Sequence, residues 1–106
     1  MIDHWILDDN GLPMPANTEQ YVAFVERGID ARRIGLDTVN DQEVSTVFLM
    51  HDHSWWGGPP LLFETMIFGG PHDMFCERYE TRANAEAGHA RVVAALREGR
   101  DPEVSE

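Results

Sequence analysis

The chain has 106 residues, of which 42% are hydrophobic and 25% are charged. This length fits a single domain with one core, and the composition is that of a globular protein rather than a disordered one. Because 19 acidic residues stand against 8 basic ones, the formal net charge is -11. That charge would repel a phosphate backbone or an anionic membrane, so we expect neither nucleic acid nor a membrane as a direct ligand. It favours a basic protein partner instead.

The sequence predicts a cytoplasmic protein. Residues 1–6 have neither a basic start nor a long apolar stretch, and no later run approaches the ~18 apolar residues that a membrane span needs. Cys76 is the only cysteine, which excludes an internal disulfide and a CxxC-type zinc site and fits a reducing compartment. We expect Cys76 to be a small buried hydrophobic residue.

The first half of the chain predicts a strand, a helix and a hairpin. A short strand is expected over 4–7 and a helix over 17–28, which begins on a capping asparagine and ends on a glycine. Residues 32–39 and 44–51 have the β-branched and aromatic composition of strands, and 40–43 that of a turn. The apolar stripe of the helix is formed by Tyr21, Phe24 and Val25.

The second half predicts two further strands and a closing helix. The strands are expected over 61–68 and 74–79, on either side of a turn rich in glycine and proline. Thr81 is placed to cap the helix, and Gly99 to end it. One face of this helix is formed, at helical spacing, by Ala85, His89, Val92 and Leu96.

This order of elements predicts an α+β fold. Hairpin-length connections argue for an antiparallel sheet of about four to five strands with two helices packed on one face, in the order β-α-β-β-β-β-α. We expect one globular domain over 1–99, followed by a polar C-terminal tail over 100–106.

A pair of histidines suggests a metal site. His51 and His53 are separated by one residue and would point to the same side of a strand, where a ligand shell could be completed by Glu64, His72 or His89. Imidazole and carboxylate suit zinc, iron or manganese. The spacing to Glu64 matches no metal motif, and a polar cluster at a strand end needs no ligand. We therefore expect no cofactor, with a metal ion as the alternative.

Glu64 interrupts an apolar strand, so its carboxylate should be partly desolvated and should need a partner. A structural ion pair is favoured over a catalytic role. For His89, on the inward face of the closing helix, we expect a core residue with satisfied hydrogen bonds. The candidate partners for Glu64 are Arg33, Arg78, His53 and His89.

Trp55 and Trp56 stand before two glycines and two prolines. Large aromatic surface on a loop is typical of a binding hot spot. The alternative is that one or both tryptophans close the end of a small core.

Several runs of the sequence carry a family resemblance. They are Ser45-Thr46-Val47-Phe48-Leu49, Asp52-His53, Gly57-Gly58-Pro59-Pro60-Leu61-Leu62-Phe63-Glu64-Thr65-Met66-Ile67-Phe68-Gly69-Gly70, Arg78-Tyr79 and Ala87-Gly88-His89. In these runs the chain resembles a family of small proteins encoded by tailed bacteriophages and prophages. Its relatives carry an apolar residue in place of His51, which leaves a shared polar set of Asp52, His53, Glu64 and His89. The resemblance implies a viral source and a bacterial host cytoplasm, but no activity.

Phage accessory proteins of this size and acidity often bind host or phage proteins, for example to block a defence system. By this analogy we expect a binding protein without catalysis that uses its acidic surface and the loop of Trp55 and Trp56. Its partner would be a protein, basic or a second copy of the chain. The alternative is a protein that binds a small molecule or a metal ion. One form of this alternative is a hydrolase, and its site residues would be Asp52, His53, Glu64 and His89.

Overall fold

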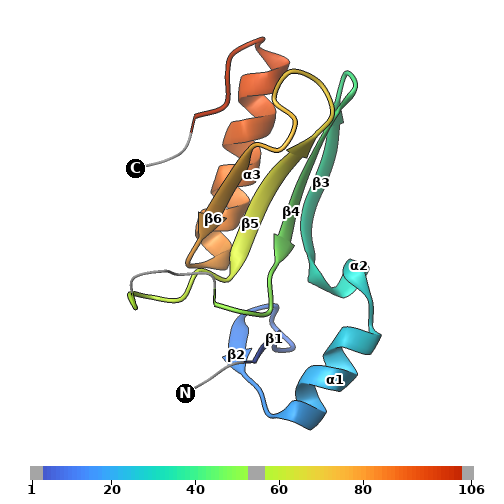
Figure 1. Cartoon of the computed structure of the whole chain (residues 1–106), viewed down its shortest axis with the longest axis vertical. Coiled ribbons are helices and arrows are strands. Elements are labelled where there is room, and N and C mark those ends of the chain that lie inside the picture. Colours follow the sequence, from blue (N-terminus) through green and yellow to red (C-terminus); the bar gives the residue numbers. More distant parts are fainter. Residues whose placement is uncertain (1–3, 53–56, 104–106) are drawn as a thin grey trace.

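The computed structural model describes residues 4–52 and 57–103, and within them the chain forms two antiparallel sheets and three helices (Figure 1). β1 (Trp5–Leu7) pairs with β2 (Pro13–Pro15) in a small sheet. The helices α1 (Thr18–Glu26) and α2 (Ile29–Arg32) follow. The predicted α+β class with an antiparallel sheet is confirmed.

The second sheet is a meander in which each strand pairs with the next along the chain. After it, α3 (Arg82–Arg97) runs along one face of the sheet (Figure 1). None of the helices in the described part of the chain is long and apolar enough to cross a membrane. The strands of the meander are β3 (Arg33–Val39), β4 (Gln42–Phe48), β5 (Phe63–Phe68) and β6 (Cys76–Tyr79).

The placement of the first helix differs from the prediction. Of the described helices, α3 covers the four-stranded sheet, whereas α1 lies beside β1 (Figure 1). Phe24 reaches from α1 to the end of the core and meets Phe48 edge to face, at 6.1 Å between ring centroids. Val25, predicted to face inward, is 47% exposed. The two helices do not share one face, because β1 and β2 form a layer of their own to which α1 packs.

The helices begin and end where the local sequence places caps. Asn17 and Gln20 form a capping box, in which each side chain accepts a hydrogen bond from the backbone N–H of the other. Thr81 caps the first turn of α3. Beyond the last turn, Gly99 has a φ of 71°, the left-handed conformation that glycine adopts most readily.

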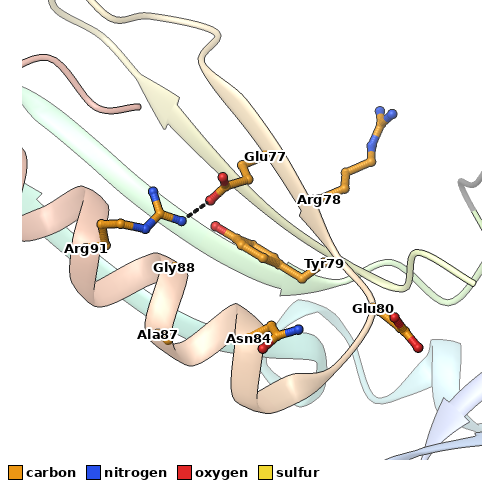
Figure 2. Close-up of a pocket in the computed structure, with 8 residues that line it drawn as sticks. All are labelled: Glu77, Arg78, Tyr79, Glu80, Asn84, Ala87, Gly88 and Arg91. Atoms are coloured by element: carbon orange, nitrogen blue, oxygen red, sulfur yellow. Dashed lines mark hydrogen bonds and ion pairs between the residues drawn. The ribbon is translucent and has the colours of Figure 1, made fainter. Parts of the chain in front are cut away.

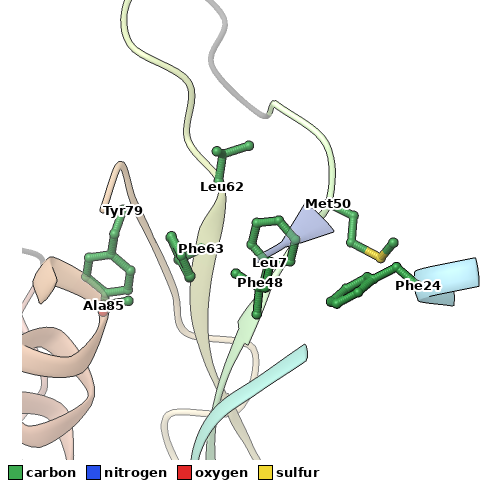
Figure 3. Packing of buried hydrophobic residues seen from close by; sticks show 8 residues of the cluster. All are labelled: Leu7, Phe24, Phe48, Met50, Leu62, Phe63, Tyr79 and Ala85. Atoms are coloured by element: carbon green, nitrogen blue, oxygen red, sulfur yellow. The ribbon is translucent and has the colours of Figure 1, made fainter. Parts of the chain in front are cut away.

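The core consists of two apolar clusters, one of which extends to β1 and α1, with a polar layer between them under α3. Along β4, Val44 belongs to one cluster and Phe48 to the other, so Thr46 lies between the two. Thr65 on β5 is the register partner of Thr46, and both are fully buried. One cluster comprises Leu7, Phe24, Phe48, Met50, Leu62, Phe63, Tyr79 and Ala85 (Figure 3). The other comprises Val39, Val44, Ile67, Val92, Val93 and Leu96.

Hydrogen bonds join the polar layer across the sheet. His89 contacts Asp37 Oδ2 through Nε2 at 2.7 Å and Thr46 Oγ1 through Nδ1 at 2.7 Å. Thr46 Oγ1 lies 2.5 Å from Thr65 Oγ1, to which the Tyr79 hydroxyl donates at 2.9 Å. A neutral His89 with its proton on Nε2 gives each hydroxyl in the series one acceptor. A shift of the strands by two residues would set these hydroxyls against apolar side chains, so the layer favours this register.

Replacing Thr46 by valine tests the polar layer. Thr46→Val leaves the Nδ1 atom of His89 and the Thr65 hydroxyl without their buried partner, so we expect the free energy of unfolding to fall by about 1–3 kcal/mol. The double variant Thr46→Val/Thr65→Val should cost less than the sum of the two single variants, because two facing hydroxyls are removed together. Urea unfolding measures both, with Thr38→Val at an exposed position of β3 as control. If the losses in unfolding free energy of the two single variants add up to that of the double variant, the contact between the Thr46 and Thr65 hydroxyls is contradicted.

Candidate binding groove beside the edge strand

A groove of about 410 Å³ lies between β6 and α3 (Figure 2). One wall comes from β6 and the residue that follows it, and the other from residues 84–91 of α3. Figure 2 shows the Arg78 side chain turned away from the groove, toward the other face of the sheet. The lining residues are Glu77, Arg78, Tyr79, Glu80, Asn84, Ala87, Gly88 and Arg91.

Tyr79 packs against the helix at Gly88. A Cβ atom at position 88 would overlap the Tyr79 ring, so glycine allows the ring to lie directly on the helix backbone. Burial holds the pKa of the Tyr79 phenol well above its ordinary value, and the neighbouring Glu77 carboxylate raises it further. Tyr79 therefore keeps its proton and its role as a hydrogen-bond donor at neutral pH.

An ion pair fixes the groove on its other side. The Glu77 carboxylate, 4% exposed, pairs with the Arg91 guanidinium of α3 (Figure 2). Arg91 also donates through Nη1 to the backbone carbonyl of Glu103 at 2.6 Å. One guanidinium thus holds β6, α3 and the C-terminal segment together and balances the buried charge of Glu77.

β6 is the last strand of the four-stranded sheet, so one side of its backbone has no neighbouring strand in the described chain. The carbonyl groups of Phe75 and Tyr79 accept from residues on the β5 side. Because backbone groups alternate along an antiparallel strand, Cys76 and Arg78 turn their N–H and C=O groups outward. Such an open edge is a template for one more strand.

Glu64 lies on the face of the sheet opposite α3. Its carboxylate pairs with its register partner Arg78 at 3.0 Å and accepts from the Cys76 thiol at 3.3 Å. The predicted structural pair is confirmed, with Arg78 as the partner. Because successive residues of a strand alternate and Thr65 faces α3, Glu64 and His89 lie on opposite faces of the sheet. The structure does not bring these two side chains together.

The remaining described candidates hold neighbouring segments in place. Asp52 accepts from the backbone N–H of Leu61 at 3.0 Å, which ties the two ends of the intervening loop. His51 Nε2 lies 2.8 Å from the Tyr21 hydroxyl of α1. His89 is 9% exposed with both ring nitrogens hydrogen-bonded, as expected for a satisfied core residue.

The metal and loop predictions include residues that lie outside the described ranges. Within residues 4–52 and 57–103, no group of three or more His, Cys, Asp or Glu side chains is placed to hold a metal ion. His53, Trp55 and Trp56 lie outside the described residues. Binding through the tryptophan loop therefore stays a prediction.

Sequence reasoning missed the groove and misplaced Cys76. Cys76 is exposed rather than buried in the core, because it alternates with Glu77 and faces away from α3. Partial burial and the Glu64 carboxylate raise the pKa of its thiol to about 11, so little thiolate exists at neutral pH. The alternation of residues 76–79 is a signal that could have placed Glu77 and Tyr79 together on the helix side.

Comparison of the chain with protein-family models, with curated proteins and with solved structures gives no match. The function is therefore inferred from the site itself.

Gly88→Ala tests the close packing of Tyr79 on α3. At an open helix position this change would stabilise the protein by about 1 kcal/mol. Here we expect the free energy of unfolding to fall by about 1–3 kcal/mol, because the Tyr79 ring must move. In a Tyr79→Ala background, which removes the ring, the same change should become stabilising. If Gly88→Ala alone raises the thermal stability, the packing of the Tyr79 ring on α3 does not require glycine at position 88.

Proposed function

We propose that this chain is a non-catalytic binding protein that takes up an extended segment of a protein partner along the open edge of β6. The observation that supports this most directly is that β6 has no neighbouring strand on its outer side in the described chain and lies beside the groove that it forms with α3. In strand addition, main-chain hydrogen bonds supply affinity and alternate side chains enter pockets. Cys76 and Arg78 offer the outward backbone groups, and every second side chain of the bound segment would enter the groove.

Charge supports a basic segment as the ligand. All 8 basic residues are arginines, and each contacts a carboxylate, a carbonyl group or an aromatic ring within the chain. The net charge of -11 thus leaves a negative field toward solvent. At the groove, Arg91 balances Glu77, while Glu80 adds an exposed carboxylate and Asn84 an amide. A lysine or arginine side chain suits this combination.

The surroundings of Asp37, His89 and Thr46, which resemble a catalytic triad, argue against hydrolysis. Asp37, His89 and Thr46 are hydrogen-bonded in the order of a catalytic triad. Thr46 is 0% exposed, so no substrate carbonyl can reach its hydroxyl. The Cys76 thiol, with a pKa of about 11, is a poor nucleophile at neutral pH. These contacts support a structural role for the groups that hydrolysis would need.

The resemblance to tailed-phage proteins supports a setting for this binding. We place the protein in the cytoplasm of an infected bacterium as an accessory factor. Its partner would be a host or phage protein, for example a component of a defence system, that presents a basic extended segment.

Two arginine substitutions on α3 test the groove. Ala87→Arg fills the groove and adds a positive charge there, whereas Ala90→Arg adds the same charge on the side of α3 that faces β3. We expect wild type to enrich extended basic peptides from a displayed random library. Ala87→Arg should weaken their binding by about tenfold or more, a loss of at least about 1.4 kcal/mol. Ala90→Arg should bind as wild type does.

A third variant separates the groove from the tryptophan loop. Trp55→Ala/Trp56→Ala should keep the affinity for these peptides. The proposal fails if no basic peptide is enriched, if both arginine variants bind equally, or if the tryptophan variant alone loses binding.

A further inference from the structure

The face of the four-stranded sheet opposite α3 carries apolar side chains that no described element covers. Leu36 and Phe68 are each 43% exposed there. We call this surface the open face, and it is formed by Arg33, Leu36, Thr38, Glu43, Ser45, Val47, Glu64, Met66, Phe68, Cys76 and Arg78. The Arg33 charge is paired with Asp30.

The middle of the open face is uncharged from one edge to the other. Strand register places Leu36, Ser45, Met66 and Cys76 in one row across the four strands. Below this row Glu64 is matched by Arg78, so Glu43 near the β3–β4 turn is the one carboxylate of the open face outside that pair. In a chain with a net charge of -11, this face is nearly neutral.

The near-neutral charge of the open face favours a second copy of the chain over a basic protein as its partner. A basic protein would gain little electrostatic attraction here, because the Glu64 charge is already balanced. A second copy of this chain meets strong repulsion over most of its surface and the least repulsion on its open face. A twofold axis parallel to the two sheets and midway between them, running over the middle row, would set the uncharged row of one copy on that of the other.

We propose that the open face pairs with the open face of a second copy in a face-to-face homodimer. Two sheets packed in this way lie about 10 Å apart, as in a β-sandwich. The inference does not depend on the proposed peptide binding. The groove lies on the α3 side of the sheet, so each copy in the dimer would keep its own groove and edge.

The size of the face sets the expected strength of the dimer. Four strands of about six residues span roughly 20 Å by 20 Å, which is about 400 Å² in outline for each copy. This is below the ~800 Å² per partner of a standard interface, so we expect dissociation in the micromolar range. Because salt screens the repulsion between two acidic copies, the dimer should tighten as ionic strength rises.

Analytical ultracentrifugation of the full chain, over micromolar to millimolar concentrations, tests the proposal. We expect a monomer–dimer equilibrium that strengthens several-fold between low and high salt. Leu36→Glu puts a carboxylate into the middle row of both copies and should weaken the dimer by about tenfold or more. Val22→Glu adds the same charge on α1 at a similar exposure, 48%, and should leave the dimer unchanged.

Circular dichroism checks that each variant folds, and Cys76→Glu is a second variant in the same row. The proposal is overturned by a wild type that stays monomeric throughout, or by a dimer that Leu36→Glu and Cys76→Glu leave intact. A dimer that only Trp55→Ala/Trp56→Ala dissolves would assign the interface to the loop and overturn it as well. The effect of Ala87→Arg on peptide binding tests the groove separately, and its result does not depend on whether the chain forms a dimer.

Discussion

Thr46, Thr65 and His89 meet at the centre of the interface between α3 and the four-stranded sheet. His89 satisfies both of its ring nitrogens only where the helix brings it between Thr46 on β4 and Asp37 on β3. The ring can lie there because β3 has Gly35 beneath it, where a Cβ atom would come within 2.9 Å of the imidazole. A buried polar group without a partner is costly, so this layer gives the helix one favoured position along the sheet.

Both surfaces proposed to bind follow from that position. With the register fixed, Tyr79 and Glu77 of β6 face α3, where Gly88 and Arg91 receive them and the groove forms. The same alternation sends every second residue to the other side, where the middle row lies uncovered. The groove and the open face are thus two consequences of one register. A dimer formed through the open face would carry two equivalent grooves and could bind a partner at both of them.

Much of the fold could be predicted because it is encoded locally. The capping box at Asn17, the cap at Thr81 and the spacing of the inward face of α3 each need only a few neighbouring residues. The pairing of Glu64 and the satisfied state of His89 also follow from a simple rule, that buried polar groups need partners.

What could not be predicted depends on long-range placement. Pro13 and Pro15 argue against a strand, yet a short two-stranded sheet tolerates proline at its edge, and β2 moves α1 away from the main sheet. The groove joins β6 to residues of α3 up to 14 positions away, as in the pair of Glu77 and Arg91. That meeting depends on how the helix crosses the sheet, which no local pattern contains.

The central claim is that the outer edge of β6 is free and takes up a strand. Amide hydrogen exchange, followed by NMR, measures this at single residues. In the free protein, the amides of Cys76 and Arg78 should exchange rapidly, whereas those of Glu77 and Tyr79, which face β5, should be protected. On addition of the basic peptide with the highest affinity, Cys76 and Arg78 should become protected by about tenfold or more. Slow exchange of Cys76 and Arg78 in the free protein, or no change with peptide, would contradict the account.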